Sequence, residues 1–145
     1  MTRIDFYHYA EDKHRFACRL ATKAYESASR LVVYSRDRRA LEALDKALWT
    51  FQATRFVPHC FADSPLAAET PIILAASDEQ LPHHDVLLNM DDEWPPFFST
   101  FERMLEIVAT DDEDKRKARA RYAFYRQRGY DIRVNAIEGE RRQGE

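Results

Sequence analysis

The 145-residue chain is poor in glycine and has only Gly129, Gly139 and Gly144. In dinucleotide-binding folds, glycines follow the first strand and let the backbone approach a phosphate closely. Here the β-prone run at 4–7 is followed by His-Tyr-Ala-Glu-Asp at 8–12. Because bulky and acidic side chains at this turn would repel a pyrophosphate, we expect no nucleotide-binding glycine loop and no bound cofactor.

The chain is also poor in cysteine, lacks long apolar runs and carries little net charge. Cys18 and Cys60 are spaced neither as a metal knuckle nor as a disulfide framework, which favours the reducing cytoplasm. No apolar run approaches the roughly 20 residues that span a bilayer, and the first residues lack the apolar core of a signal peptide. The net charge of −3 argues against a general nucleic-acid coat, so any binding of anions is local.

Two histidine-containing pairs invite a chemical interpretation. His83 and His84 are adjacent, and adjacent residues in a strand point to opposite faces and cannot both reach one metal ion, so we expect a surface loop pair. His59 and Cys60 resemble a thiol beside a base, but no third group that would orient the base is evident. We therefore expect no metal site and no catalytic residue, and an enzyme that uses His59 and Cys60 is the least favoured hypothesis.

Strand-like and helix-like segments alternate along the chain. The predicted strands are 4–7, 31–34, 71–76, 84–90 and 130–134, and the predicted helices are 12–28, 37–49, 97–108 and 112–128. Interleaved strands and helices imply right-handed crossovers, which predicts a single α/β, Rossmann-like domain at 1–137 with a mainly parallel sheet flanked by helices. The segment 50–70 is expected to be irregular, 130–134 an edge strand, and 138–145 a disordered tail.

The most distinctive stretch is 115–128, which holds seven basic side chains, three aromatic ones and no acid. On a helix, Lys115, Arg119, Tyr122 and Arg126 lie within one stripe about 60° wide. The acids at 111–114 oppose the helix dipole favourably, and a glycine follows the helix. A cationic row that contains an aromatic ring suits an acidic partner with an apolar anchor. A solvated surface helix is the alternative.

Three motifs make the chain similar to the chi subunit family of bacterial DNA polymerase III, from about Phe6 to Val134. They are Asp-Lys-Ala-Leu-Trp at 45–49, Phe-Val-Pro-His at 56–59, and Arg-Ala-Arg-Tyr-Ala-Phe-Tyr-Arg at 119–126 with the Gly-Tyr that follows at 129–130. The resemblance implies a Rossmann-like accessory of the clamp loader in DNA replication. Members of the family bind no nucleotide and have no catalytic activity of their own.

The resemblance also implies a site for the acidic C-terminal tail of single-stranded-DNA-binding protein. That tail ends in acidic residues, an aliphatic residue, proline and a phenylalanine with a free carboxylate. The lysine and arginine of the family's tail site fall on Lys115 and Arg119, its aromatic residue on Tyr122, and its apolar residue, at the end of the preceding helix, on Val108. Arg126 continues the stripe and is included in the predicted site.

A second implied site comprises Trp49 and Phe56, where the family contacts the psi subunit of the clamp loader or, in some bacteria, a helicase-like protein. The alternative is that Trp49 is a core residue at the end of an amphipathic helix. The leading hypothesis is therefore an adaptor that meets nucleic acid only indirectly and has no membrane partner. The runner-up is a module that binds single-stranded nucleic acid directly, with bases stacking on the aromatic rings of the helix 115–128.

Overall fold

The computed structural model describes residues 1–51 and 56–137. Its strands are β1 (Arg3–Ala10), β2 (Leu31–Tyr34), β3 (His59–Phe61), β4 (Ile72–Ala75), β5 (Val86–Asn89), β6 (Arg103–Ala109) and β7 (Asp131–Ala136). Its helices are α1 (Lys13–Glu26), α2 (Arg38–Thr50) and α3 (Asp112–Gln127), with short 3₁₀ turns η1 (Ala67–Glu69) and η2 (Phe98–Thr100). The predicted tail at 138–145 lies outside the described residues.

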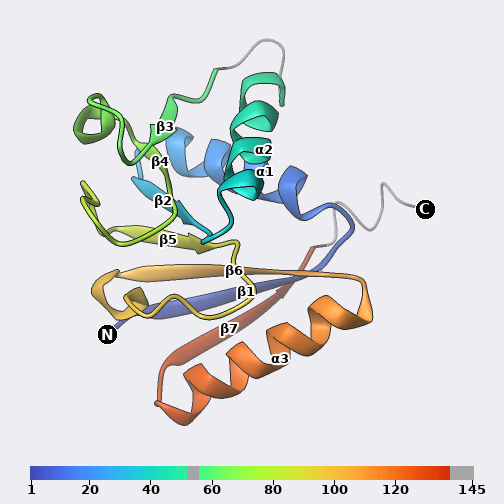
Figure 1. The fold of residues 1–145 in the computed structure, drawn as a ribbon. Helices are drawn as coiled ribbons and strands as arrows, with labels where there is room; N and C mark the ends of the chain where they lie inside the picture. The colour runs from blue at the N-terminus through green and yellow to red at the C-terminus, as the bar shows by residue number, and fades with distance from the viewer. Residues whose placement is uncertain (52–55, 138–145) are drawn as a thin grey trace.

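One open sheet contains all seven strands in the order β3-β4-β2-β5-β6-β1-β7, and every paired neighbour is parallel. Helices α1 and α2 lie together on one face of the sheet, and α3 packs on the opposite face over β6 and β7 (Figure 1). The predicted α/β fold is confirmed, and β7 is an edge strand as expected. None of the helices in the described ranges is long and apolar enough to cross a membrane.

Aspartate side chains cap the three helices at their N-termini. Asp12 accepts a hydrogen bond from the backbone N–H of Arg15, Asp37 from that of Arg39, and Asp111 from the third residue of α3. Each cap satisfies an N–H group that has no partner within its helix. At the other end of α3, Gly129 has a φ of +79°, a left-handed conformation that suits glycine and turns the chain into β7.

The predicted helix at 97–108 is wrong. The structure has η2 at its start and then β6, which lies between β5 and β1 in the middle of the sheet. The spacing of Phe98, Phe101, Leu105 and Val108 matches a helix by coincidence, but five consecutive residues of β6 are buried because helices cover both faces of the sheet. Val108 therefore lies near the end of a strand and not at the end of a helix.

The part of the predicted irregular segment 50–70 that follows residue 55 contains the three-residue strand β3 and η1, so the prediction is wrong there. Strand β3 pairs with β4 and forms the second edge of the sheet. Two hydrophobic clusters fill the interior. One packs under α1 and α2 around Leu41, Leu44 and Leu88, and the other packs under α3 around Met104 and Tyr125.

Candidate partner-binding site

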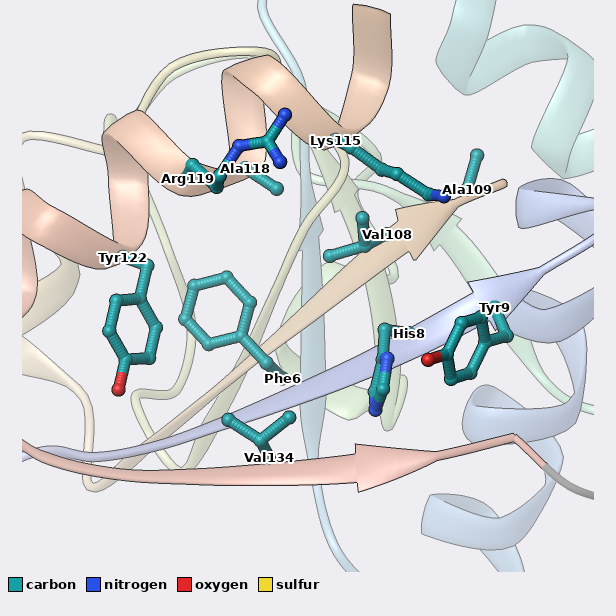
Figure 2. Close-up of a pocket in the computed structure, with 10 residues that line it drawn as sticks. All are labelled: Phe6, His8, Tyr9, Val108, Ala109, Lys115, Ala118, Arg119, Tyr122 and Val134. Atoms are coloured by element: carbon teal, nitrogen blue, oxygen red, sulfur yellow. The ribbon is translucent and has the colours of Figure 1, made fainter. Parts of the chain in front are cut away.

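A pocket of about 330 Å³ lies between α3 and the ends of three neighbouring strands (Figure 2). It is lined by Phe6, His8 and Tyr9 of β1, Val108 and Ala109 of β6, Lys115, Ala118, Arg119 and Tyr122 of α3, and Val134 of β7. The pocket forms here because β1, β6 and β7 are adjacent in the sheet and α3 packs across the same face.

The structure brings four of the five predicted tail-site residues together. Val108, Lys115, Arg119 and Tyr122 all line the pocket, although Val108 reaches it from a strand. Arg126 lies one turn further along α3, and its guanidinium donates a hydrogen bond to the Tyr122 hydroxyl at 3.4 Å. Arg126 thus contacts a lining residue without lining the pocket itself. The binding role of these residues stays a prediction.

The floor of the pocket is apolar and closely packed. Phe6, Val108 and Ala118 are almost entirely buried. The Phe6 ring meets the Tyr122 ring edge to face, with centroids 5.6 Å apart. Val134 on the edge strand is 57% exposed and extends the apolar surface outward. An apolar side chain placed in this hollow would therefore leave water and contact apolar side chains on several sides, which is favourable.

The cations of α3 fall into two groups. Arg116 pairs with Glu113, and Lys117 pairs with Asp92 at 3.0 Å, so their charges are locally balanced. By contrast, no carboxylate within residues 1–51 and 56–137 lies at ion-pair distance from Lys115 or Arg119. Lys115 and Arg119, the two cations that line the pocket, thus have charge left to offer an anion.

A buried polar network fixes α3 on the sheet. The Arg121 guanidinium donates to a Glu106 carboxylate oxygen at 3.0 Å, and the other oxygen accepts from Tyr125 at 2.5 Å and from Asn89 at 3.0 Å. Arg121 also donates to the backbone carbonyl of Asp92 at 2.7 Å. Burial, together with the neighbouring Glu106 charge, raises the pKa of Tyr125 well above its usual value, so its hydroxyl stays a donor.

The predicted second site is an exposed aromatic pair. Trp49 is 59% exposed and Phe56 is 52% exposed, which excludes the alternative that Trp49 is a core residue. Their ring centroids lie 5.0 Å apart. Two large rings that pack on each other while both face solvent form a ready-made apolar anchor. The binding role of the pair stays a prediction.

His59 lies beneath the aromatic pair, with its ring centroid 5.1 Å from Trp49 and 6.0 Å from Phe56. Its Nδ1 is 2.7 Å from the Val57 carbonyl oxygen, and its Nε2 is 3.0 Å from a carboxylate oxygen of Asp45. Asp45 and His59 belong to two different sequence motifs, at 45–49 and 56–59. Their contact therefore explains how two separated segments present one aromatic surface.

The two residues of each histidine-containing pair have different surroundings in the structure. His59 faces Trp49, whereas Cys60, the next residue of β3, packs against the cluster under α3 on the other face of the sheet. His83 and His84 lie before β5, but only His84 is exposed, and the prediction of a surface pair is wrong for His83, which is buried. Desolvation lowers the pKa of His83, and the His84 ring packs against Phe101. Within the described ranges, no three histidine, cysteine, aspartate or glutamate side chains are grouped as a metal site would require.

Several lining residues were not predicted from the sequence. Phe6 and His8 of β1 and Val134 of β7 reach the pocket because these even-numbered residues face α3. The alternation of side chains along a strand could have indicated this, once the pairing of β1 with β7 was known. Tyr9 breaks this alternation and had no sequence signal.

Comparison with known proteins assigns the family. The model of the family described as DNA polymerase III chi subunit, HolC, matches residues 1–133. The DNA polymerase III subunit chi of Pseudomonas aeruginosa is 34% identical over 141 residues, covering 94% of this chain and 98% of the relative. Those of Haemophilus influenzae and Escherichia coli K12 are 28% and 27% identical, covering 83% and 81% of this chain and 85% and 81% of the relatives. The chain therefore belongs to the chi subunit family of DNA polymerase III, which functions in DNA replication.

Proposed function

We propose that this chain is a non-catalytic subunit that links the clamp loader to single-stranded-DNA-binding protein by holding that protein's acidic C-terminal tail. The observation that supports it most directly is the pocket under α3, where an apolar floor adjoins Lys115 and Arg119, two cations without a carboxylate partner among the described residues. An acidic peptide that ends in a phenylalanine has the complementary chemistry.

Each side chain of the pocket has a distinct task in this proposal. The planar guanidinium of Arg119 forms two parallel hydrogen bonds with one carboxylate, whereas Lys115 acts as a point charge for neighbouring aspartates. The terminal phenylalanine of the tail enters the hollow and contacts Val108 and Tyr122. Exposed ion pairs contribute about 1 kcal/mol each, so we expect an affinity on the order of micromolar.

The proposal is tested by titrating a labelled acidic peptide that ends in Ile-Pro-Phe against the wild type and Arg119→Ala. We expect the dissociation constant to rise about 5-fold in the variant, which corresponds to one lost surface pair. Arg116→Ala is the matched control, because Arg116 lies on the same helix but pairs with Glu113. Equal binding by the wild type and Arg119→Ala, or no binding by either, contradicts the site.

Salt gives an independent check of the same proposal. Because the charges are exposed, raising the ionic strength from about 0.05 M to 0.5 M should weaken the peptide complex several-fold. Arg119→Ala should show a shallower dependence than the wild type. Binding that is indifferent to salt would mean that the apolar hollow alone holds the peptide.

The aromatic pair of Trp49 and Phe56 is the proposed site of a second partner, the psi subunit of the clamp loader, or a helicase-like protein in its place. Aromatic side chains that are exposed in the free protein and close to one another are typical anchors of protein interfaces. Residues 45–49 and 56–59, which build the pair, are also the motifs that the chain shares with its family.

Direct binding of single-stranded nucleic acid is the second candidate function. It is favoured by Trp94, which is 36% exposed and stacks on Phe124 with centroids 3.6 Å apart. Phe124 itself is covered, because the Arg128 guanidinium lies 3.6 Å from its centroid. The net charge of −3 and the ion pair between Lys117 and Asp92 oppose direct binding. An electrophoretic mobility shift assay with a bare oligonucleotide at low salt distinguishes the two candidate functions. Tight binding of the oligonucleotide without a protein partner would favour direct nucleic-acid binding.

A further inference from the structure

Strand β1 is interrupted at the pocket by a bulge. Tyr7 of β1 pairs with Ile107 of β6, but Ala10 pairs with Ala109, so three steps along β1 match two along its neighbour. Within the bulge Tyr9 has a φ of 72°, which is left-handed backbone that disfavours a bulky side chain. Bulges are rare in parallel sheets and occur preferentially where a side chain must be re-aimed.

The bulge changes where the Tyr9 side chain points. In a regular strand, His8 and Tyr9 would face opposite sides of the sheet. Instead both line the pocket under α3, and their rings lie together with centroids 4.1 Å apart (Figure 2). An unfavourable backbone conformation at a candidate site, held by the surrounding sheet, points to a function for the residue that adopts it.

Tyr9 closes one end of the pocket. Figure 2 shows Tyr122 at one end and Tyr9, beside His8, at the other, with Phe6 and Val108 between them. Tyr9 is 36% exposed and lines the pocket. The hollow thus has an aromatic wall at both ends, and the cations of α3 stand along its side.

We propose that Tyr9, turned into the pocket by the bulge and backed by His8, is a specificity-determining residue that selects an aromatic side chain at the tip of the bound acidic peptide. The inference rests on the proposed function, because it concerns the same pocket. Tyr9 and Tyr122 enclose the aromatic tip from two ends, while Lys115 and Arg119 pair with the carboxylates. Aromatic pairs add affinity beyond the area that they bury, which a methyl group cannot reproduce.

The experiment compares two labelled peptides, one acidic and ending in Ile-Pro-Phe, the other identical but ending in Ile-Pro-Ala. The wild type should bind the first peptide more tightly. Tyr9→Gly should lower the affinity for the phenylalanine peptide by about 5-fold and that for the alanine peptide by less than about 2-fold. Tyr9→Phe should keep the preference for the phenylalanine peptide. Glycine accepts the left-handed backbone readily, so Tyr9→Gly should fold, and a thermal melt should show this.

Tyr25→Ala is the matched control, because Tyr25 is similarly exposed but lies on α1 and does not line the pocket. If the wild type prefers the phenylalanine peptide and Tyr9→Gly keeps the full preference, the inference is overturned while the tail site stands. An equal loss of affinity for both peptides also overturns the inference, because Tyr9 would then shape the pocket without distinguishing the last residue of the peptide. If the wild type binds neither peptide, the proposed function itself fails.

Discussion

The Arg121 guanidinium on α3 lies 3.0 Å from the Glu106 carboxylate on β6, and both side chains are almost entirely buried. Two residues earlier on the same helix, Arg119 is exposed and faces the pocket. One cation therefore holds the helix to the sheet while the other is left for a ligand. The two arginines carry the same charge, so only their burial distinguishes the structural residue from the exposed one.

Replacing Arg121 by methionine should lower the free energy of unfolding by about 3–5 kcal/mol, because Glu106 would remain buried without its partner. Urea denaturation at pH 7 measures the change. Arg119→Met is the matched control and should cost less than about 0.5 kcal/mol, since the side chain is exposed. The double variant Glu106→Gln, Arg121→Met should recover part of the loss. A cost below about 1 kcal/mol for Arg121→Met would show that the pair is not anchoring α3.

Asp91 should make stability depend on acid pH. Burial raises its pKa, but hydrogen bonds from the Arg36 side chain and from the backbone N–H groups of Arg36 and Glu93 outweigh burial and hold the pKa below its ordinary value. A carboxyl whose pKa is lower in the folded state stabilises the protein above its unfolded-state pKa. This contribution is lost as the pH falls through the folded-state pKa.

The corresponding variant is Asp91→Asn. Its urea midpoint should lie below that of the wild type at about pH 6, and the gap should narrow towards about pH 3 as the wild-type carboxyl is protonated. Asp63→Asn is the control, because Asp63 is exposed and lies 3.9 Å from Arg38 at its closest. A gap for Asp91→Asn that stays constant between these pH values would contradict the prediction.

Removing either ring of the aromatic pair should leave the fold intact but abolish binding of the second partner. Trp49→Ala and Phe56→Ala should each change the unfolding free energy by less than about 1 kcal/mol, because both rings are exposed. A pull-down from cell lysate, read by mass spectrometry, should lose the clamp-loader or helicase-like protein. Leu66→Ala, also at an exposed apolar residue, should retain it. Retention of the partner by both aromatic variants would remove this surface from the proposal.

The two thiols should differ sharply in reactivity. Burial raises the pKa of Cys18 to about 11, so at pH 8 roughly one thiol in a thousand is ionised, and the residue is also shielded by the core. Cys60 is partly exposed. A disulfide reagent at pH 8 should therefore modify one thiol in the native protein and the second only in denaturant. Modified protein should still bind the acidic peptide, and loss of binding would implicate Cys60 in the site.

Helical periodicity predicted the part of the site that lies on one helix. Lys115, Arg119 and Tyr122 share a face of α3 because their spacing follows the helix turn, and no tertiary information is needed to see this. Tyr9 could not be found in the same way. Its orientation depends on a bulge against β6, and strand alternation places it on the wrong face.

The interpretation of β6 as a helix failed for a related physical reason. Glu106 in the middle of the segment is a charged residue, which in an isolated pattern favours an exposed helix face. Its burial is possible only because Arg121, Tyr125 and Asn89 supply hydrogen bonds from α3 and β5. Val108, which the family resemblance assigned to the predicted tail site, lines the pocket, but it does so from a strand and not from the end of a helix.

The strand order has a geometric consequence for partner binding. His59 of β3 supports the aromatic pair at one border of the sheet, and Val134 of β7 borders the pocket at the other. Six interstrand steps of about 4.8 Å set these borders roughly 30 Å apart. Under the proposed function, the domain is therefore a rigid spacer that keeps two bound partners apart, with the distance between their sites fixed by backbone hydrogen bonds.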